Sequence, residues 1–431
     1  MSGIAFQKDK LKIGLDTQSL PAKLVLQKIA KRVAGILIIF SIQMLLSRLM
    51  GVRHFGHFAV ITTVIGLLVV ISTFGFDSAA GFFLTQYEGA EKSGLQKGFI
   101  HYSNRCLALT SVICAVGVFF FLLTFSKKFN IAFAEAFFWA ILMLPFLTLL
   151  KQANFFVRKL KGNKTVVPIT VTLPFITLLG SLYYYHENQK LTVDAVLMIA
   201  FLATVLLYMI FRSKLNKIRV ENESEAHYSR TKWTTASGIF FMTDLVNFLI
   251  ANSGILLLSY FIDNTNAGYF FVTLKLTGFV SIAGSIVTMI SVPVLLDLAI
   301  KKRKKQIREH LRNGVFRILS IALPAAFILL IIGKQILGLF GDKFAGEKWL
   351  LIILIVAQLL NSLSWLNGKA LVVTGNKNTY LFILIGTLTA LLISGFFLVP
   401  AYKLLGAGFA VLASALFYYV SSTVMVKKLA Y

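Results

Sequence analysis

Long apolar runs alternate with short polar segments along most of the chain. An α-helix needs about 20 predominantly apolar residues to cross the hydrocarbon core of a bilayer, and most of the runs have roughly this length. The pattern therefore predicts twelve membrane-spanning helices, with edges near 33–47, 57–76, 106–126, 131–150, 166–185, 194–211, 236–261, 267–295, 314–340, 349–373, 379–399 and 404–426.

The composition is that of an integral membrane protein. Of the 431 residues, 57% are hydrophobic and 14% are charged, whereas soluble domains have about 25% charged residues. In lipid, backbone polar groups must be satisfied within the spanning segment, so apolar runs of this length form helices. We predict an all-α integral membrane protein of about twelve transmembrane helices, whose connections are too short to form an extramembrane domain.

The net charge of +26 is distributed unevenly between the two sides of the predicted bundle. Of the 43 Lys and Arg residues, 32 fall on the side of the N-terminus and 9 on the opposite side, while Lys275 and Lys369 lie within runs. Because basic residues concentrate in cytoplasmic segments, this excess predicts that both termini are cytoplasmic. The topology explains most of the charge without a nucleic-acid partner.

The densest basic run is KKRKK at residues 301–305, which is followed by QIREHLR. It has two interpretations. It is either a solvated cytoplasmic loop, which we favour, or a basic helix that lies against anionic lipid headgroups.

The two halves of the chain show a weak repeat. Residues 46–60, LSRLMGVRHFGHFAV, match residues 258–272, LSYFIDNTNAGYFFV, at five of fifteen positions, including Gly56 with Gly268. Two six-helix repeats of the same orientation predict two lobes around a central cavity. The predicted division is a cytoplasmic segment at 1–32, a first lobe at 33–213, a cytoplasmic connection at 214–235 and a second lobe at 236–426.

Lys275 is the most unusual residue of the predicted spans, because a charge at such depth costs about 3 kcal/mol on insertion scales. Small and hydroxyl residues share another face of the same run: Thr277, Ser281, Gly284, Ser285, Thr288 and Ser291. We favour the interpretation that these residues form a packing seam and that Lys275 faces the cavity, where it would attract a phosphate. Alternatively, the hydroxyl stripe lines the cavity and Lys275 snorkels or pairs within the bundle.

Polar residues of the seventh run fall within an arc of about 140° on a helix. Asp244, Asn247 and Asn252 either line a wet cavity or form hydrogen bonds between helices. We predict that Asn247 and Asn252 contribute to substrate binding and that Asp244 carries a coupling ion, either a proton or sodium.

Four further residues complete the predicted site. Arg48 and Arg53 lie at the outer turn of the first hairpin, where they either meet an anion or anchor the interface. Gln43, in the first run, shares the predicted cavity. Asp77, in FGFDSAAG, lies either at a helix break or in a cytoplasmic turn, and is a second candidate for ion coupling.

No catalytic set is evident. The sequence contains neither a nucleotide-binding glycine-rich loop with lysine nor a His/Cys cluster with metal-ligand spacing. We therefore expect no enzyme activity, no metal and no cofactor.

Several stretches together resemble the polysaccharide (O-antigen type) flippases of the multidrug/oligosaccharidyl-lipid/polysaccharide (MOP) exporter superfamily. They are LLSRLMGVRHFGHFAV with FGFDSAA, NAGYFFVTLKL, ILGLFGDKFAGEKWLLIILI and FLVPAYKLLGAGFAVLASAL, in this order along the chain. The resemblance implies the two-lobed fold of MATE and other MOP transporters, with a cationic cavity. By position, Lys275, Arg48 and Arg53 match basic residues that members of the family use.

The resemblance also implies a function. Flippases of this type move undecaprenyl-diphosphate-linked oligosaccharide, an O-antigen or other surface polysaccharide unit, across the bacterial inner membrane by alternating access. The implied partners are this substrate, membrane lipids, a coupling ion and other polysaccharide assembly proteins. Two alternatives stay open: a drug/cation antiporter of the same superfamily and a membrane polysaccharide polymerase.

Overall fold

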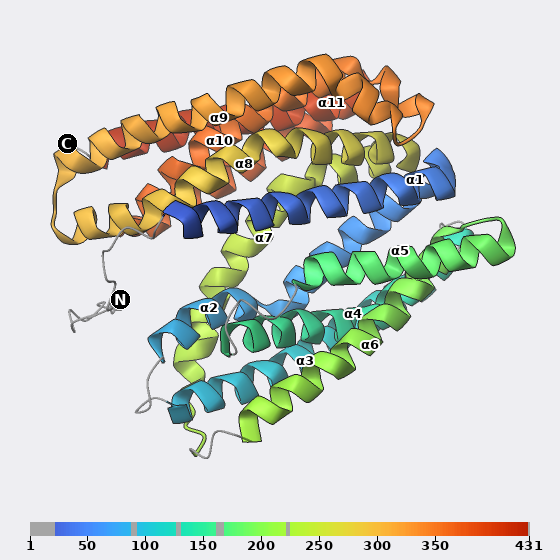
Figure 1. Ribbon diagram of the computed structural model, residues 1–431, viewed down its shortest axis with the longest axis horizontal. Helices are drawn as coiled ribbons and strands as arrows, with labels where there is room; N and C mark the ends of the chain where they lie inside the picture. The colour runs from blue at the N-terminus through green and yellow to red at the C-terminus, as the bar shows by residue number, and fades with distance from the viewer. Residues whose placement is uncertain (1–21, 88–92, 126–130, 161–167, 221–224, 430–431) are drawn as a thin grey trace.

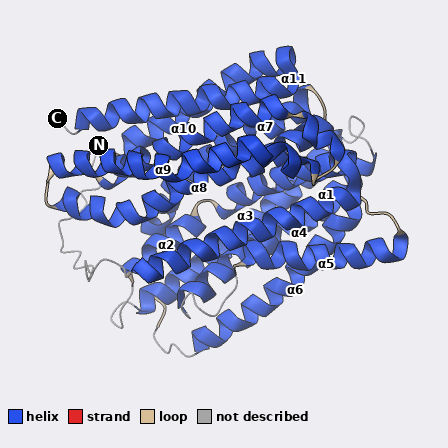
Figure 2. Ribbon diagram, turned by 45° about the horizontal axis from the view of Figure 1, so that its top comes forward, coloured by secondary structure: helices blue, strands red, loops and turns tan. Residues whose placement is uncertain are grey.

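The computed structural model describes residues 22–87, 93–125, 131–160, 168–220 and 225–429, and the fold is described for these residues. Most of the predicted segment 1–32 and part of the predicted connection 214–235 lie outside them. In the described part of the chain the secondary structure is helical, without strands (Figure 2).

The helices follow one another closely along the chain. In chain order they are α1 (Ala22–Thr73), α2 (Phe76–Gln86), α3 (Ser93–Phe125), α4 (Ile131–Leu160), α5 (Ile169–Asn188), α6 (Val193–Val220), α7 (Arg230–Phe261), α8 (Asn264–Ile300), α9 (Lys304–Gly338), the short 3-10 helix η3 (Asp342–Gly346), α10 (Lys348–Val373) and α11 (Lys377–Leu429).

Every predicted apolar run overlaps one of these helices, and nine of the described helices are long and apolar enough to cross a membrane. Two of the nine, α1 and α11, each overlap two predicted runs. A 52-residue helix such as α1 would be about 78 Å long if straight, more than twice the thickness of a bilayer core. It is interrupted at Gly51 (φ 77°), and α11 is interrupted at Lys403 (φ 50°). The all-α membrane fold is therefore confirmed, while the count of twelve crossings stays a prediction.

The helices form two lobes, as predicted (Figure 1). Figure 1 shows α8–α11 on one side and α2–α6 on the other, with α1 and α7 running between them. Separate clusters of buried apolar side chains fill the two lobes. The lobe boundaries that we drew in the sequence stay predictions.

Two predicted connections contain more helix than expected. Residues 77–105 include most of α2 and the first turns of α3, because the chain breaks at Phe74 (φ 43°) and Gly75 (φ 72°) and then immediately resumes a helix. The favoured interpretation of the basic run as a solvated loop is wrong beyond its first residues, since α9 begins at Lys304. Only a three-residue turn, with Lys302 at φ 54°, separates α8 from α9.

We call the end at which α1 reverses the hairpin end, and the end at which α1 begins and α11 finishes the terminal end (Figure 1). At the hairpin end the lobes meet through glycine. A Cβ atom on Gly268 of α8 would lie 2.8 Å from the Cα atom of Gly56, and one on Gly56 would overlap the Asn264 carbonyl. The two glycines are the aligned pair of the predicted repeat. Residues related by a two-fold axis can touch their own counterparts only near that axis, so the contact supports two repeats arranged about it.

Candidate functional site

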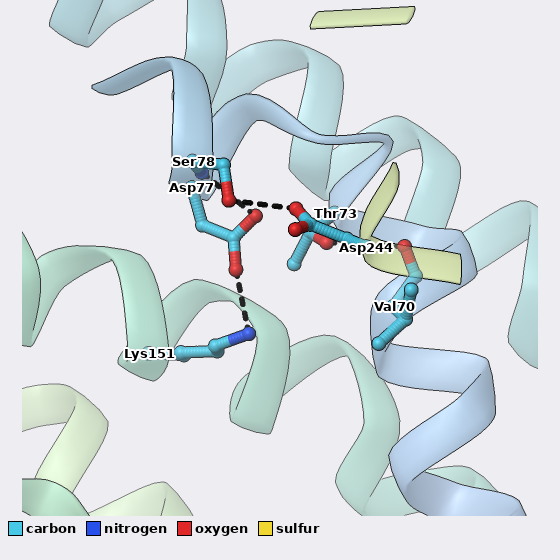
Figure 3. Close-up of polar contacts among 6 residues, drawn as sticks. All are labelled: Val70, Thr73, Asp77, Ser78, Lys151 and Asp244. Carbon is cyan, nitrogen blue, oxygen red and sulfur yellow. Dashed lines mark hydrogen bonds and ion pairs between the residues drawn. The ribbon is translucent and has the colours of Figure 1, made fainter. Parts of the chain in front are cut away.

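A chain of polar contacts joins three helices of the two lobes inside the bundle (Figure 3). Lys151 Nζ of α4 lies 2.6 Å from Asp77 Oδ2 of α2, and the Ser78 hydroxyl donates to Asp244 Oδ2 of α7 at 2.6 Å. The backbone N–H of Ser78 donates to Asp77 Oδ1 at 3.0 Å, which links the two contacts. We call Lys151, Asp77, Ser78 and Asp244 the polar chain.

The helix break before α2 determines the position of the polar chain. Phe74 and Gly75 both have positive φ values, and the turn puts Asp77 and Ser78 in the first turn of α2. A Cβ atom on Gly75 would overlap the backbone of Ser237 and Phe241 in α7. A side chain larger than hydrogen at this position would therefore push α2 away from α7, and the contact between Ser78 and Asp244 depends on Gly75.

The polar chain continues into the second lobe through α10 and α11. The side chain of Tyr380 lies near those of Tyr418 and Asn247, and Asn247 lies one helical turn after Asp244 on α7. Lys369 of α10 and Lys151 both act electrostatically on Asp244. A half-buried carboxylate, two lysines and two tyrosine hydroxyls thus share one polar region between the lobes.

Lys275 lies on another helix and closer to the hairpin end. Its ammonium group lies 5.1 Å from the centroid of the Phe271 ring, a distance typical of a cation–π contact. The side chain is exposed in this structure.

The small-residue stripe of α8 forms a packing seam against α10. Thr277, Gly284, Thr288 and Ser291 are buried. A Cβ atom on Gly284 would lie 2.7 Å from the Cα atom of Ser362, and the Ser362 hydroxyl donates to the Val280 carbonyl at 3.4 Å. The favoured interpretation of this stripe is confirmed for its buried members, and Lys275 lies on a different face of the helix.

The chain matches one known protein family over most of its length. The sequence profile of the family described as "Polysaccharide biosynthesis protein" matches residues 24–299, well over half of the chain. The chain belongs to this family. The match extends from α1 to the last turn of α8, and it includes the polar chain and Lys275.

Among polysaccharide biosynthesis proteins, the capsular polysaccharide biosynthesis protein CapF of Staphylococcus aureus is 29% identical to this chain over 129 residues. That alignment covers 30% of this chain and 33% of CapF, so the chain matches only about a third of the length of this relative.

Solved structures of transporters have the same fold. The lipid II flippase MurJ, in its inward closed conformation, aligns with a TM-score of 0.63 at 13% identity and covers 92% of this chain and 87% of its own. An inward-facing multidrug resistance MATE family transporter of the MOP superfamily aligns with a TM-score of 0.68 at 12% identity and covers 93% and 98%. These likenesses show that the chain has the predicted two-lobed helical fold, and its long apolar helices agree with a multi-pass membrane protein.

The structure does not bring the residues predicted from the sequence together at one site. Asp77, Asp244 and Asn247 lie in the polar region between the lobes, and Asp77 lies at a helix break, which was one of its two predicted settings. Asn252 donates to the Phe248 carbonyl of its own helix at 2.9 Å. Gln43 is half-buried on α1.

Arg48 and Arg53 are exposed at the hairpin end. Arg48 Nε donates to the Leu339 carbonyl at 2.5 Å, beside the Ser47 hydroxyl, which donates to the Phe340 carbonyl at 3.1 Å. A cation at the C-terminus of a helix, here α9, interacts favourably with the helix dipole. Arg48 therefore joins the lobes in this conformation, and its role as a substrate ligand stays a prediction.

Asp244 and Lys275 are separated along the bundle axis. Asp244 lies 17 residues before the end of α7 at the hairpin end, and Lys275 lies 11 residues after the start of α8 at the same end. At 1.5 Å per residue this is a difference of about 9 Å in depth. Within the described residues no ion pair joins them.

Sequence reasoning missed Lys151, Ser78, Tyr380 and Tyr418. Lys151 directly follows the fourth apolar run, so it was counted among the cytoplasmic basic residues. The tyrosines lie within apolar runs, where an aromatic residue gives no signal of a polar function. In the structure α4 continues as a helix past residue 150 to Leu160, and this extension places Lys151 inside the bundle.

Proposed function

We propose that this protein translocates an undecaprenyl-diphosphate-linked oligosaccharide, an O-antigen or other surface polysaccharide unit, across the bacterial inner membrane. The family, the local similarity to a capsular polysaccharide biosynthesis protein and the fold shared with a lipid II flippase support this proposal. The distribution of basic residues supports an orientation with both termini in the cytoplasm.

The observation that carries the proposal is the placement of charge within an apolar bundle. Charged residues inside membrane-spanning segments are costly and typically mark a substrate or ion pathway. Lys275, Lys151 and Asp244 lie in α8, α4 and α7, each of which is long and apolar enough to cross a membrane. The polar chain lies where the two lobes meet.

In the proposed cycle the two lobes rock about a fixed site and expose it to each side of the membrane in turn. The diphosphate and the sugars cross between the lobes, while the prenyl tail remains in lipid. Lys275 is the proposed ligand of the diphosphate, because an ammonium group in a setting of low dielectric strongly attracts an anion. Asn247, Asn252 and Gln43 would bind sugar hydroxyls, and Arg48 and Arg53 would meet the headgroup at the hairpin end.

Net transport requires a driving gradient, and the polar chain suggests where a coupling ion binds. Asp77 already has the ammonium group of Lys151 as a partner at 2.6 Å, whereas Asp244 has a neutral hydroxyl donor. Asp244 is therefore the carboxylate with capacity for a proton or a sodium ion. Binding of either ion would reduce the attraction between Asp244 and the Ser78 hydroxyl, and so weaken one contact between the lobes.

Translocation of a fluorescent lipid-linked oligosaccharide in proteoliposomes tests the proposal. We expect K275A to slow translocation at least tenfold. K334A, which removes an exposed lysine of α9, is the matched control and should translocate at the rate of the wild type. Normal translocation by K275A would refute the diphosphate site, and absence of translocation by the wild-type protein would refute the function.

A drug/cation antiporter is the second candidate, because the MATE transporter aligns well in fold and Asp244 offers an acidic group. The same vesicles separate the two functions. An antiporter would exchange an organic cation against protons or sodium and would not require Lys275.

A further inference from the structure

A strongly basic pocket lies at the terminal end of the second lobe, outside the proposed substrate path. Its volume is about 830 Å³. The turn between α8 and α9, the first turns of α9 and the last turns of α10 and α11 surround it. In Figure 1 these segments lie together at the end marked by the C-terminus.

The rim of the pocket is cationic. Six basic side chains line it, and among the described lining residues there is one acidic side chain, Glu309. The basic residues are Lys302, Lys304, Lys305, Arg308, Arg312 and Lys427. A concave surface with one sign of charge focuses its field and concentrates counter-ions, so the pocket selects for an anion.

The wall of the pocket has the groups that a phosphate ester and an attached chain would contact. Asn367 is buried, and its Nδ2 atom donates to the Thr423 hydroxyl at 3.1 Å, while Tyr419 also lines the pocket. Apolar side chains such as Leu311 and Val315 complete the wall. The pocket therefore combines a cationic rim, polar groups and an apolar wall.

The pocket lies at the level where α9 changes from polar to apolar residues. The last basic lining residue of the helix is Arg312, and the apolar run begins at about residue 314. Basic residues at such a boundary lie at the level of the lipid headgroups.

Helix α10 separates this pocket from the polar region between the lobes. Asn367 and Leu371 line the pocket, whereas Lys369, which acts on Asp244, lies on the roughly opposite face of the helix at 100° per residue. A ligand in the pocket would thus not occupy the proposed substrate site.

We propose that this pocket binds the phosphate group of an anionic phospholipid from the leaflet at the terminal end, with the start of an acyl chain against the apolar wall. The tight turn at Lys302 and the helical start of α9 hold the basic side chains around the pocket. The basic run of the sequence is then a lipid-binding element, and its site does not depend on the proposed substrate.

Binding of phosphatidylglycerol to the purified full-length protein, measured in mixed detergent micelles against phosphatidylcholine, tests this proposal. The variant K305Q/R312Q removes two exposed cations of the rim, and K301Q/K428Q removes two cations of the same end that do not line the pocket. We expect at least tenfold weaker phosphatidylglycerol binding in K305Q/R312Q, and binding like that of the wild type in K301Q/K428Q. Equal losses in both variants would show general surface attraction and overturn the site.

A second variant and a second ligand sharpen the test. A299W fills the pocket without a change of charge and should also weaken phosphatidylglycerol binding, whereas unaltered binding would place the lipid elsewhere. Inorganic phosphate should compete only weakly, because it cannot use the apolar wall. If phosphate alone binds as tightly as phosphatidylglycerol, the ligand is a free phosphate and the lipid assignment is wrong.

Discussion

Two of the contacts between the lobes have opposite chemistry. At the hairpin end Gly56 and Gly268 bring backbone against backbone, and no side chain lies between them. At the other contact Ser78 and Asp244 meet through a polar bond that belongs to a chain with a lysine and a second carboxylate. Close packing resists any change of volume, whereas a charged hydrogen bond responds to ions and to protons. We infer that the first contact is a pivot and the second a releasable latch.

Added volume at the glycine contact should have the largest effect. G56A and G268A place a methyl group against backbone atoms of the other lobe, and overpacking of this kind costs about 3 kcal/mol. We expect a large loss of thermal stability in detergent. G278A is the control in the same helix as Gly268, because a Cβ atom there meets nothing within 4 Å and alanine favours a helix. Equal melting temperatures for G268A and G278A would contradict the proposed pivot.

Removal of charge at the latch should affect transport more than folding. D244N keeps the shape of the side chain but cannot bind a proton or sodium as a carboxylate does. We expect at least a tenfold loss of the ion dependence of translocation, measured in proteoliposomes with imposed gradients. T243V is the control, since the Thr243 hydroxyl bonds only to its own helix, at the Ile239 carbonyl. Retained ion dependence in D244N would remove Asp244 from the coupling mechanism.

The ion pair between Lys151 and Asp77, beside the latch, should contribute less to the free energy of unfolding than the glycine contact. The side chains of Lys151 and Asp77 are 43% and 17% exposed, so water screens the pair in part. A double-mutant cycle with K151A and D77A should give a coupling energy of about 1 kcal/mol that decreases with salt. Unfolding by denaturant in detergent measures it, and a coupling energy of zero would show that the pair does not form.

The smallest effect concerns Tyr87, which follows α2 and accepts a hydrogen bond from Trp233 Nε1 of α7 at 3.1 Å. Burial raises the pKa of Tyr87 above its ordinary value of 10.0, and the bond from Trp233 lowers it in part. A raised pKa in the folded state means that the folded form prefers the neutral phenol, so this contribution is complete below pH 10 and is lost above it.

We expect the wild-type protein to lose a small part of its stability through this group as the pH rises through the pKa of the folded state. Y87F should lack that loss, because it has no hydroxyl to ionise. Thermal unfolding between pH 8 and pH 11 in detergent measures the difference. If the melting temperatures of the wild type and Y87F change with pH in parallel, Tyr87 is not the source of this pH dependence.

The sequence predicted much of this fold, because the tendency of a segment to enter a membrane is the sum of contributions from its own residues. Apolar length alone located helices at every predicted run. The repeat aligned Gly56 with Gly268 before their contact was known. The packing seam of α8 also followed from spacing, since residues that share a helix face can be found from 3.6 residues per turn.

The candidate site was only partly predictable. Asp244 and Asp77 stood out as charges in or beside apolar runs, but their connection through Ser78 depends on the turn at Phe74 and Gly75. Lys151 and the basic run at 301–305 were both interpreted from their position between runs. Helices that continue past the apolar run changed both interpretations.

The sequence by itself thus determined the membrane class and the helices, because these properties arise from local composition. Only the tertiary structure decided that Lys151 pairs with Asp77, that Arg48 binds the end of α9 and that the basic run borders a pocket. Those pairings join residues that are tens to hundreds of positions apart. They depend on which helix faces meet, and packing of the whole bundle determines those faces.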